Sequence, residues 1–497
     1  MKKKLLAVGV AATLGVMSGV AGAAMEVQAS GVGHVNVLPY YSVQGGNATL
    51  INITNTDQLN GKVVKVRFRG AEFSDDVFDF QVFLSPGDVF TGAVTQEGTK
   101  AKFATVDKTC TLPASVNQPF VDIRLRDDKK PTGTLEGYVE IITMGDIPFT
   151  AGTPPVPGNP LATAIQHVNG TPTCSAAALV GTNPLVPVTH KAVADGGTGY
   201  LAPPTSGITS HAIVINVPSS KAFTFPATAL SPTAPVAYVP YWRQANIALF
   251  ATPADQLPAA LLPLTHDRVF ASNSGAVKLY EFDLPDLSTP YDPAGATADL
   301  QRDLTSTALQ RPQVYVDYVT DPSISAATDV VLSQPTRRYY YTYTPITESV
   351  ATVTGADGLY ATLDVATNRI GVGSATFYDR EEQTAVSGSS IVISPNPPSA
   401  ATRFSLLGEV AIISVNSSKV PTDALGGSLT SQIYTAPNGF RDGWATLSTT
   451  TNTGTPVQLP VIGFEAINVF NGGVGSAGTN YGLTLPLRGP VTVTPNN

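Results

Sequence analysis

Apolar and polar residues alternate with a period of two in short runs along most of this chain, and Gly, Pro, Asn and Asp separate the runs. A period of two places alternate side chains on opposite faces of a β-strand. Runs 35–41 and 48–54, joined through Gly45 and Gly46, predict a hairpin. In the next run, 62–69, one face is apolar and the other is basic: Val64, Val66 and Phe68 against Lys65, Arg67 and Arg69.

Further strands are expected at regular spacing, at 78–84, 121–125, 138–143, 211–217, 237–242, 247–251, 276–282, 314–319, 338–344, 409–415, 443–448 and 460–469. Many short strands separated by turns are typical of an immunoglobulin-like sandwich. One helix is expected at 298–309, where Leu300, Leu304 and Ala308 form an apolar stripe. The predicted fold class is therefore mainly β, with immunoglobulin-like β-sandwich domains, Pro/Gly-rich insertions and little helix.

Changes in composition divide the chain into segments. Residues 30–150 are expected to form an N-terminal β-sandwich. Residues 151–205 are rich in Pro, Gly and Thr, and because proline removes ladder donors they predict a surface excursion with at most short elements. Residues 206–395 are expected to form an inserted β-rich domain. Residues 396–497 are expected to supply a final block of strands.

The first 23 residues have the pattern of a secretory signal peptide. Lys2, Lys3 and Lys4 precede an apolar run, 5–20, and small residues follow it. We expect cleavage after Ala23, with Ala29 as the alternative. No later stretch approaches the ~18 uninterrupted apolar residues that cross a bilayer as a helix, so no transmembrane span is expected in the exported chain.

Composition and charge narrow the class of partner. The chain carries 29 Lys and Arg against 37 Asp and Glu, and loss of the three leader lysines takes its formal net charge from −8 to −11. This excess of acidic residues argues against nucleic acid as a partner. Only 13% of residues are charged and 43% are apolar, which is enough for large cores and leaves polar surfaces that can pack against copies of themselves.

Cys110 and Cys174 are the only cysteines of the chain. An even pair in an exported protein predicts a disulfide. A redox or metal role is the alternative, and it would need closer spacing or histidine partners. We therefore expect the two thiols to be joined.

Acidic residues gather in two stretches that are candidates for binding calcium. They are Glu72, Asp75, Asp76 and Asp79 in the first stretch, and Asp283, Asp286 and Asp292 in the second. Hard cations take six to eight oxygen ligands, and neighbouring copies of the chain could complete such a shell. Solvated turns are the alternative. Calcium is thus a hypothesis, and no other cofactor is expected.

Tyrosines recur at 339–343, where Tyr339, Tyr340, Tyr341 and Tyr343 alternate across an expected strand. Tyrosine is favoured at partner contacts and for sugar stacking, because its ring is apolar and its hydroxyl can hydrogen-bond. The core and rim of a sandwich explain the same pattern equally well.

No catalytic motif is apparent. The five histidines stand singly, without a His-Glu-x-x-His or Gly-x-Ser-x-Gly pattern. Residues 473–478 match Gly-x-Gly-x-x-Gly, but neither a helix nor an acidic residue about twenty positions later follows, which favours a loop. We expect a protein that is not an enzyme.

Several strings resemble the opening of betaproteobacterial cell-surface proteins, including surface-layer (S-layer) subunits. They are Leu-Pro-Tyr-Tyr-Ser-Val-Gln-Gly-Gly-Asn at 38–47, and 50–57, 64–70 and 79–89; 136–142 and Leu-Pro-Val-Ile-Gly-Phe at 459–464 are similar to further parts of the pattern. The similarity covers about a third of the chain. Because it appears at both ends, it implies that strands of 405–497 complete the first sandwich.

The resemblance implies a structural subunit that self-assembles into a two-dimensional lattice on the extracellular face of the cell envelope. Its partners would be copies of itself and the lipopolysaccharide or outer-membrane surface. Repeated heterologous contacts that do not close into a ring build such a lattice. A secreted adhesin or glycan-binding sandwich module is the alternative, and a secreted hydrolase is the third class.

Overall fold

The computed structural model describes the following residues: 24–123, 125, 128–149, 159–180, 201–236, 241, 244, 267–270, 277–280, 284–291, 297–344, 349–352, 358–364, 367–381, 402–416, 424–427, 431–435, 440–452, 455–473 and 478–489. Antiparallel strands dominate them, and three α-helices accompany the strands. The expected β-rich sandwich class is confirmed, and its immunoglobulin-like character stays a prediction. The leader falls outside the described residues.

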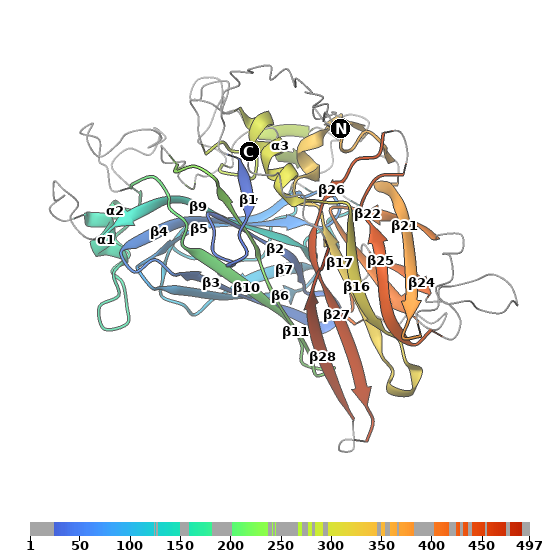
Figure 1. Ribbon diagram of the computed structural model, residues 1–497. Helices are drawn as coiled ribbons and strands as arrows, with labels where there is room; N and C mark the ends of the chain where they lie inside the picture. The colour runs from blue at the N-terminus through green and yellow to red at the C-terminus, as the bar shows by residue number, and fades with distance from the viewer. Residues whose placement is uncertain are drawn as a thin grey trace, which may run out of the picture.

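The first sandwich is built entirely from residues before 233 (Figure 1). Its larger sheet has the order β1 (Met25–Val27), β12 (Thr228–Pro232), β2 (Val35–Ser42), β9 (Glu136–Pro148), β4 (Asn60–Gly70), β5 (Asp76–Leu84) and β8 (Cys110–Leu112). The facing sheet has the order β11 (Lys221–Pro226), β10 (Ile208–Asn216), β3 (Asn47–Asn55), β6 (Val89–Glu97) and β7 (Lys100–Ala104).

The second sandwich uses residues after 312. One sheet has the order β16 (Gln313–Val319), β25 (Asp442–Ser448), β21 (Arg369–Asp379) and β20 (Leu363–Asp364), with β22 (Thr402–Leu407) also on β21. The other, which we call the central sheet, has the order β24 (Ser431–Thr435), β23 (Val410–Asn416), β17 (Ala327–Ser333), β27 (Ile462–Asn471) and β28 (Thr479–Pro486). Two-stranded sheets pair β13 (Asp267–Phe270) with β14 (Val277–Tyr280), β15 (Gln310–Arg311) with β26 (Leu459–Pro460), and β18 (Tyr341–Thr344) with β19 (Ser349–Thr352).

Both faces of the central sheet are buried, each in a different core. Val330 and Ile413 pack within the second sandwich, whereas Val331, Ile412 and Phe464 belong to the core of the first. Successive residues of a strand point to opposite faces, so these strands carry apolar residues at consecutive positions. The two sandwiches therefore share one packed interior.

The expectation that strands of 405–497 complete the first sandwich is wrong. The described strands of that stretch hydrogen-bond within the second sandwich. Strands β10, β11 and β12, from the segment assigned to the inserted domain, complete the first sandwich instead. The late strands join neither sheet of the first sandwich but pack against it, as in the stacked rings of Phe225 and Phe464, 4.0 Å apart.

The predicted hairpin at 35–54 is also wrong. Strands β2 and β3 lie in opposite sheets of the first sandwich, and a short 3-10 turn, Gln44–Gly46, carries the chain from one to the other. Gly45 and Gly46 have φ values of 60° and 87°, a region that glycine adopts without steric cost. All of β2 is buried because both of its faces are covered, which leaves no solvent-facing side for a simple hairpin.

Helix α3 (Ala298–Leu309) has the predicted bounds, and Thr297 caps it through Leu300 N. Leu304 and Ala308 of the predicted stripe are partly buried against the core. The fully buried positions are largely polar and include Gln301, Arg302 and Thr305. Short helices α1 (Pro160–Ile165) and α2 (Ala176–Val180) lie in the proline-rich excursion. None of the helices in the described ranges has the length and apolar character to cross a membrane.

Four further strand predictions fail in whole or in part, or fall outside the described residues. Residues 121–123 and 125 are not in a strand. The expected strand at 338–344 begins as a 3-10 helix, Arg337–Tyr340, and becomes β18 only at Tyr341. The expected strands at 237–242 and 247–251 lie outside the described residues, apart from Tyr241.

Candidate functional site

The basic face of β4 is buried. The side chains of Lys65, Arg67 and Arg69 are at most 2% exposed, so the polar face predicted from the alternation is not a solvent face. Two segments that are distant in sequence cover it. Gln244 accepts a hydrogen bond from Lys65 Nζ at 2.8 Å, and the Pro285 carbonyl accepts one from Arg67 Nη1 at 2.8 Å.

Carboxylates on the neighbouring strands neutralise these cations. Arg67 donates to Asp76 on β5 at 3.1 Å and to Glu140 on β9 at 3.3 Å. Arg69 donates to the other oxygen of Glu140 at 3.3 Å. Burial of charge is tolerated when the charges are paired and hydrogen-bonded, so these residues form an internal ionic layer.

The predicted calcium ligands are engaged in other ways. Asp76 pairs with Arg67, Asp79 pairs with Lys65, and Glu72 pairs with Lys129 at 2.8 Å. Asp75 lies in the turn between β4 and β5, where its carbonyl accepts from Gly70 N. Within the described ranges, no three His, Cys, Asp or Glu side chains come together as a metal site.

The second acidic stretch is described only at Asp286, because Asp283 and Asp292 lie outside the described residues. Asp286 is buried, and its carboxylate accepts from Ser288 N at 2.9 Å and from Ser288 Oγ at 2.7 Å. It thus holds its own turn together. The closeness of these acidic residues in the sequence suggested a cluster of metal ligands. It did not show that the Asp286 carboxylate accepts hydrogen bonds from the amide and hydroxyl groups of its own turn.

Tyr339 and Tyr340 are buried, so these two are not surface contacts. Tyr339 Oη accepts from Leu287 N at 3.2 Å, and Tyr340 Oη donates to Ser306 Oγ at 2.8 Å. Burial raises the pKa of both phenols. The side chains of Tyr341 and Tyr343 lie outside the described part of the chain.

Cys110 and Cys174 are joined as predicted, with Cα atoms 5.3 Å apart. Cys110 lies on edge strand β8, and Cys174 lies between α1 and α2. The bond therefore ties the excursion to the first sandwich. The small cluster around it contains Leu161, Ile165 and Leu179 from the two short helices.

Ser85, His167 and Asp88 come together beside this excursion. Ser85 Oγ lies 3.5 Å and Asp88 Oδ2 lies 3.8 Å from the same ring nitrogen, His167 Nδ1. A catalytic triad needs the serine and the carboxylate on different nitrogens of the imidazole. This arrangement does not meet that requirement.

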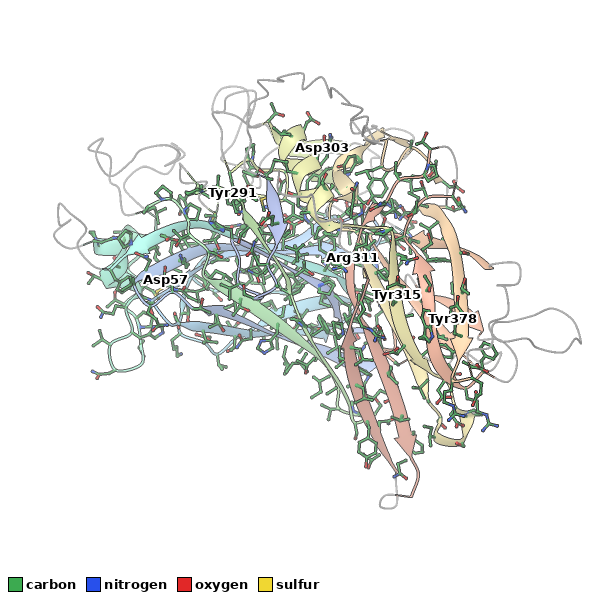
Figure 2. The ribbon with its side chains drawn as sticks, viewed as in Figure 1. Asp57, Tyr291, Asp303, Arg311, Tyr315 and Tyr378 are labelled. Carbon is green, nitrogen blue, oxygen red and sulfur yellow. A yellow bond between two sulfur atoms is a disulfide. The ribbon has the colours of Figure 1, made fainter. Side chains whose placement is uncertain are left out.

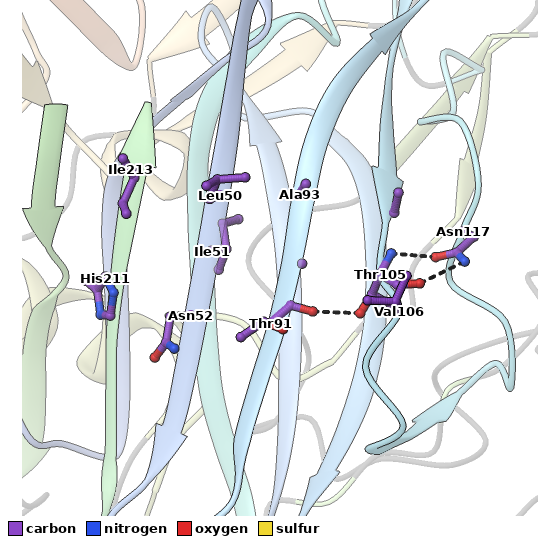
Figure 3. Close-up of a pocket in the computed structure, with 12 residues that line it drawn as sticks. Leu50, Ile51, Asn52, Thr91, Ala93, Thr105, Val106, Asn117, His211 and Ile213 are labelled. Atoms are coloured by element: carbon purple, nitrogen blue, oxygen red, sulfur yellow. Dashed lines mark hydrogen bonds between the residues drawn. The ribbon is translucent and has the colours of Figure 1, made fainter. Parts of the chain in front are cut away.

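A pocket of about 620 Å³ opens on the outer face of the smaller sheet of the first sandwich (Figure 3). We call it the sheet pocket. Its lining side chains come from β3, β6, β10 and the segment after β7, and include Leu50, Ala93, Val106, His211 and Ile213. Val106 is 93% exposed and Leu50 is 39% exposed. No Asp, Glu, Lys or Arg lines it among the described residues.

A second apolar surface lies on the hairpin formed by β27 and β28. Val469 pairs with Tyr481, and Leu483 follows two positions later on the same face. Tyr481 is 49% and Leu483 is 54% exposed. We call Val469, Tyr481 and Leu483 the hairpin patch. The end of β27 extends past its neighbour β17, whose pairing stops at Asn468, and Figure 1 shows the hairpin projecting from the body.

An aromatic cluster lies on the outer face of the second sandwich. Trp444 on β25 is 39% exposed, and its ring stacks on Tyr378 of β21 at 4.3 Å. Tyr315 of β16 meets Trp444 edge-on at 6.2 Å. Figure 2 shows Tyr315 and Tyr378 on this sandwich. The sequence alone does not indicate this cluster, because its members are distant in sequence and meet only through the register of β16, β25 and β21.

Fold and surfaces together define a β-protein of two sandwiches with an internal ionic layer and several uncharged surface patches. Comparisons with protein-family models, with curated proteins and with solved structures found no match. The function of this chain is therefore argued from its own residues.

Proposed function

We propose that this chain is a structural surface-layer subunit that self-assembles into a two-dimensional lattice on the extracellular face of the cell envelope. The observation that carries the proposal is the distribution of charge. Lys62, Lys65, Arg67, Arg69 and Arg337 are all buried, so five of the 29 Lys and Arg side chains lie inside the molecule. Outer faces with few charges favour association between copies.

The shared core supports the same function. A lattice needs subunits that present their contact surfaces in a fixed relation, and the central sheet holds the two sandwiches together on both of its faces. The predicted leader and the resemblance to cell-surface proteins also support it. Lipopolysaccharide or the outer-membrane surface is the proposed anchor, and no catalytic step is proposed.

The experiment is assembly of the purified mature chain at increasing concentration, without enzyme or template. We expect ordered sheets in negative-stain micrographs and sedimentation with cell envelopes in fractionated cells. A matched titration with calcium and with chelator tests whether a divalent ion at contacts between copies strengthens the sheets. Monomers under all of these conditions, together with protein in the culture fluid only, would contradict the proposal.

A secreted glycan-binding module is the second candidate, and the Trp444 cluster is the observation that favours it. Aromatic rings bind sugars by stacking, and the ion pair between Arg488 and Asp317 at the neighbouring strand places exposed hydrogen-bonding groups beside them. A glycan array distinguishes the two candidates. Specific binding by a monomeric wild-type chain that Trp444→Ala abolishes would favour this module.

A further inference from the structure

We propose that the hairpin patch of one subunit inserts into the sheet pocket of a second copy, and that this head-to-tail contact propagates the rows of the lattice. The inference rests on the proposed function and adds to it the pair of surfaces that meet. Both surfaces are apolar and exposed, and contiguous exposed apolar surface marks sites of interaction.

The chain does not fill its own pocket. All described lining residues of the sheet pocket come from positions 50–213, and none comes from the hairpin. Gly482 also fixes the hairpin in place. A Cβ there would lie 2.2 Å from the Ala222 carbonyl oxygen, so the backbone of β28 lies directly against β11. The hairpin patch is therefore held away from the sheet pocket of the same subunit.

The lack of charge on both surfaces suits a second copy as the occupant. Copies with a formal net charge of −8 repel one another, so contact between them is least unfavourable where both surfaces lack charge. The sheet pocket has no Asp, Glu, Lys or Arg among its described lining residues, and β28, Thr479–Pro486, contains none. Both surfaces therefore lack the charged side chains that would oppose contact between copies.

The sizes are also compatible. A pocket of about 620 Å³ is within the range that accepts a compact group of side chains or a small ligand. Tyr481 supplies an aromatic ring with a polar tip, and Asn52, Thr91 and His211 at the pocket can hydrogen-bond to that tip. Because the two surfaces differ, the contact is heterologous and leaves one hairpin and one pocket open on every pair.

The experiment uses two double variants of the mature chain. The hairpin variant is Tyr481→Asp with Leu483→Asp, and the pocket variant is Leu50→Asp with Val106→Asp. We expect neither to form sheets alone. Mixed in equal amounts they should form pairs and stop there, because one intact hairpin meets one intact pocket; sedimentation velocity measures this. Val168→Asp, at a valine that is 62% exposed in the excursion, is the matched control and should assemble like wild type.

Loss of the thermal unfolding transition identifies a variant that does not fold. In that case Leu483→Ala and Val106→Ala are used in place of the aspartate substitutions. We then expect a higher critical concentration for assembly than in wild type. Sheets from either aspartate variant at the wild-type concentration would overturn the inference, and so would a mixture that stays monomeric.

A cross-linking test separates this inference from the proposed function. Chains carrying Leu483→Cys and Val106→Cys, with tags of different size, are mixed under oxidising conditions. We expect mixed dimers above the level given by Leu483→Cys with Val168→Cys. If the wild-type chain never forms sheets, the proposed function fails while this readout still decides the contact. Equal cross-linking in both mixtures would overturn the contact.

Discussion

At the scale of one residue, Glu465 is a buried carboxyl group that forms no ion pair among the described residues. It lies on β27 with its side chain inaccessible, and one carboxyl oxygen accepts from Asp317 N at 2.8 Å. The other oxygen, Oε1, has no hydrogen-bond partner among the described residues. Burial raises the pKa of Glu465 to about 8, and the neighbouring carboxylate of Asp317 adds to the rise.

The raised pKa gives a pH dependence of known sign. The folded state holds the proton of Glu465 up to about pH 8, whereas the unfolded chain loses it near 4.5. The folded state therefore binds more protons between these values, and the contribution to stability is full below 4.5 and lost as pH rises to 8. We expect Glu465→Gln to remove this loss and to raise the free energy of unfolding at pH 8.5 by about 1–3 kcal/mol.

Urea unfolding of wild type and Glu465→Gln at pH 5 and 8.5 measures the effect. Glu381→Gln, at an exposed glutamate, is the control and should change neither value. The same difference between the two proteins at both pH values would contradict the assignment.

Residue patterns predicted the alternation in β4 but not its environment. The sequence places Lys65, Arg67 and Arg69 on one face correctly, and a polar face ordinarily faces solvent. The sequence does not predict that Gln244 and Pro285, which are far along the chain, cover that face. The ion pairs of Asp76 and Asp79 could not be predicted for the same reason, since their partners lie on a neighbouring strand.

At the scale of elements, the hairpin of β27 and β28 depends on a close backbone approach. Gly482 on β28 faces Ala222 on β11, and Asn480 Nδ2 donates to the Ser219 carbonyl at 2.5 Å in the turn before β11. These contacts fix the hairpin to the first sandwich. A side chain at Gly482 would push the two strands apart.

We expect Gly482→Ala to lower the free energy of unfolding by about 1–3 kcal/mol, because a methyl group overlaps the Ala222 carbonyl and the backbone must shift. Gly472→Ala is the matched control in the same hairpin, since its added Cβ would meet only Phe470 at an ordinary 3.4 Å. Thermal unfolding measures both. Equal melting temperatures for the two variants would contradict the close approach.

Elements with one strong local signal were predicted well. Helix α3 has its Thr297 cap, and β5 and β16 have clear alternation, so local chemistry defines them. The corner at 44–46 could not be separated from a hairpin turn, because two glycines serve either purpose and only tertiary packing decides which strands pair. The sheet pocket and the Trp444 cluster depend on strand register, which the sequence does not specify.

At the scale of the whole molecule, Phe464 lies where the two sandwiches meet. Its ring is 1% exposed, stacks on Phe225 and lies 6.3 Å from Tyr40. Glu409 N and Val410 N both donate to the Ala71 carbonyl, at 2.8 and 3.0 Å, across the same junction. Separation of the sandwiches would expose this apolar surface and break these bonds.

We therefore expect both sandwiches to open in one cooperative transition. Native-state hydrogen exchange should give the same opening free energy for slow amides in β4 of the first sandwich and β25 of the second. Phe464→Ala should lower both values, by about 3–5 kcal/mol if the site does not collapse around the lost ring. Val217→Ala, at a valine that is 73% exposed, is the control. Amides of one sandwich that exchange at a lower free energy in the wild-type chain would contradict the shared core.

For the proposed lattice, the central sheet has a consequence for how a layer of such subunits bends. A continuous layer around a cell must follow surfaces of different curvature. Since each face of the central sheet is packed in a core, the angle between the sandwiches cannot change without exposing residues such as Phe464 and Val331. Curvature of the layer must then be taken up at the junctions between neighbouring subunits, where the tilt of one rigid unit against the next sets the radius that the coat can follow.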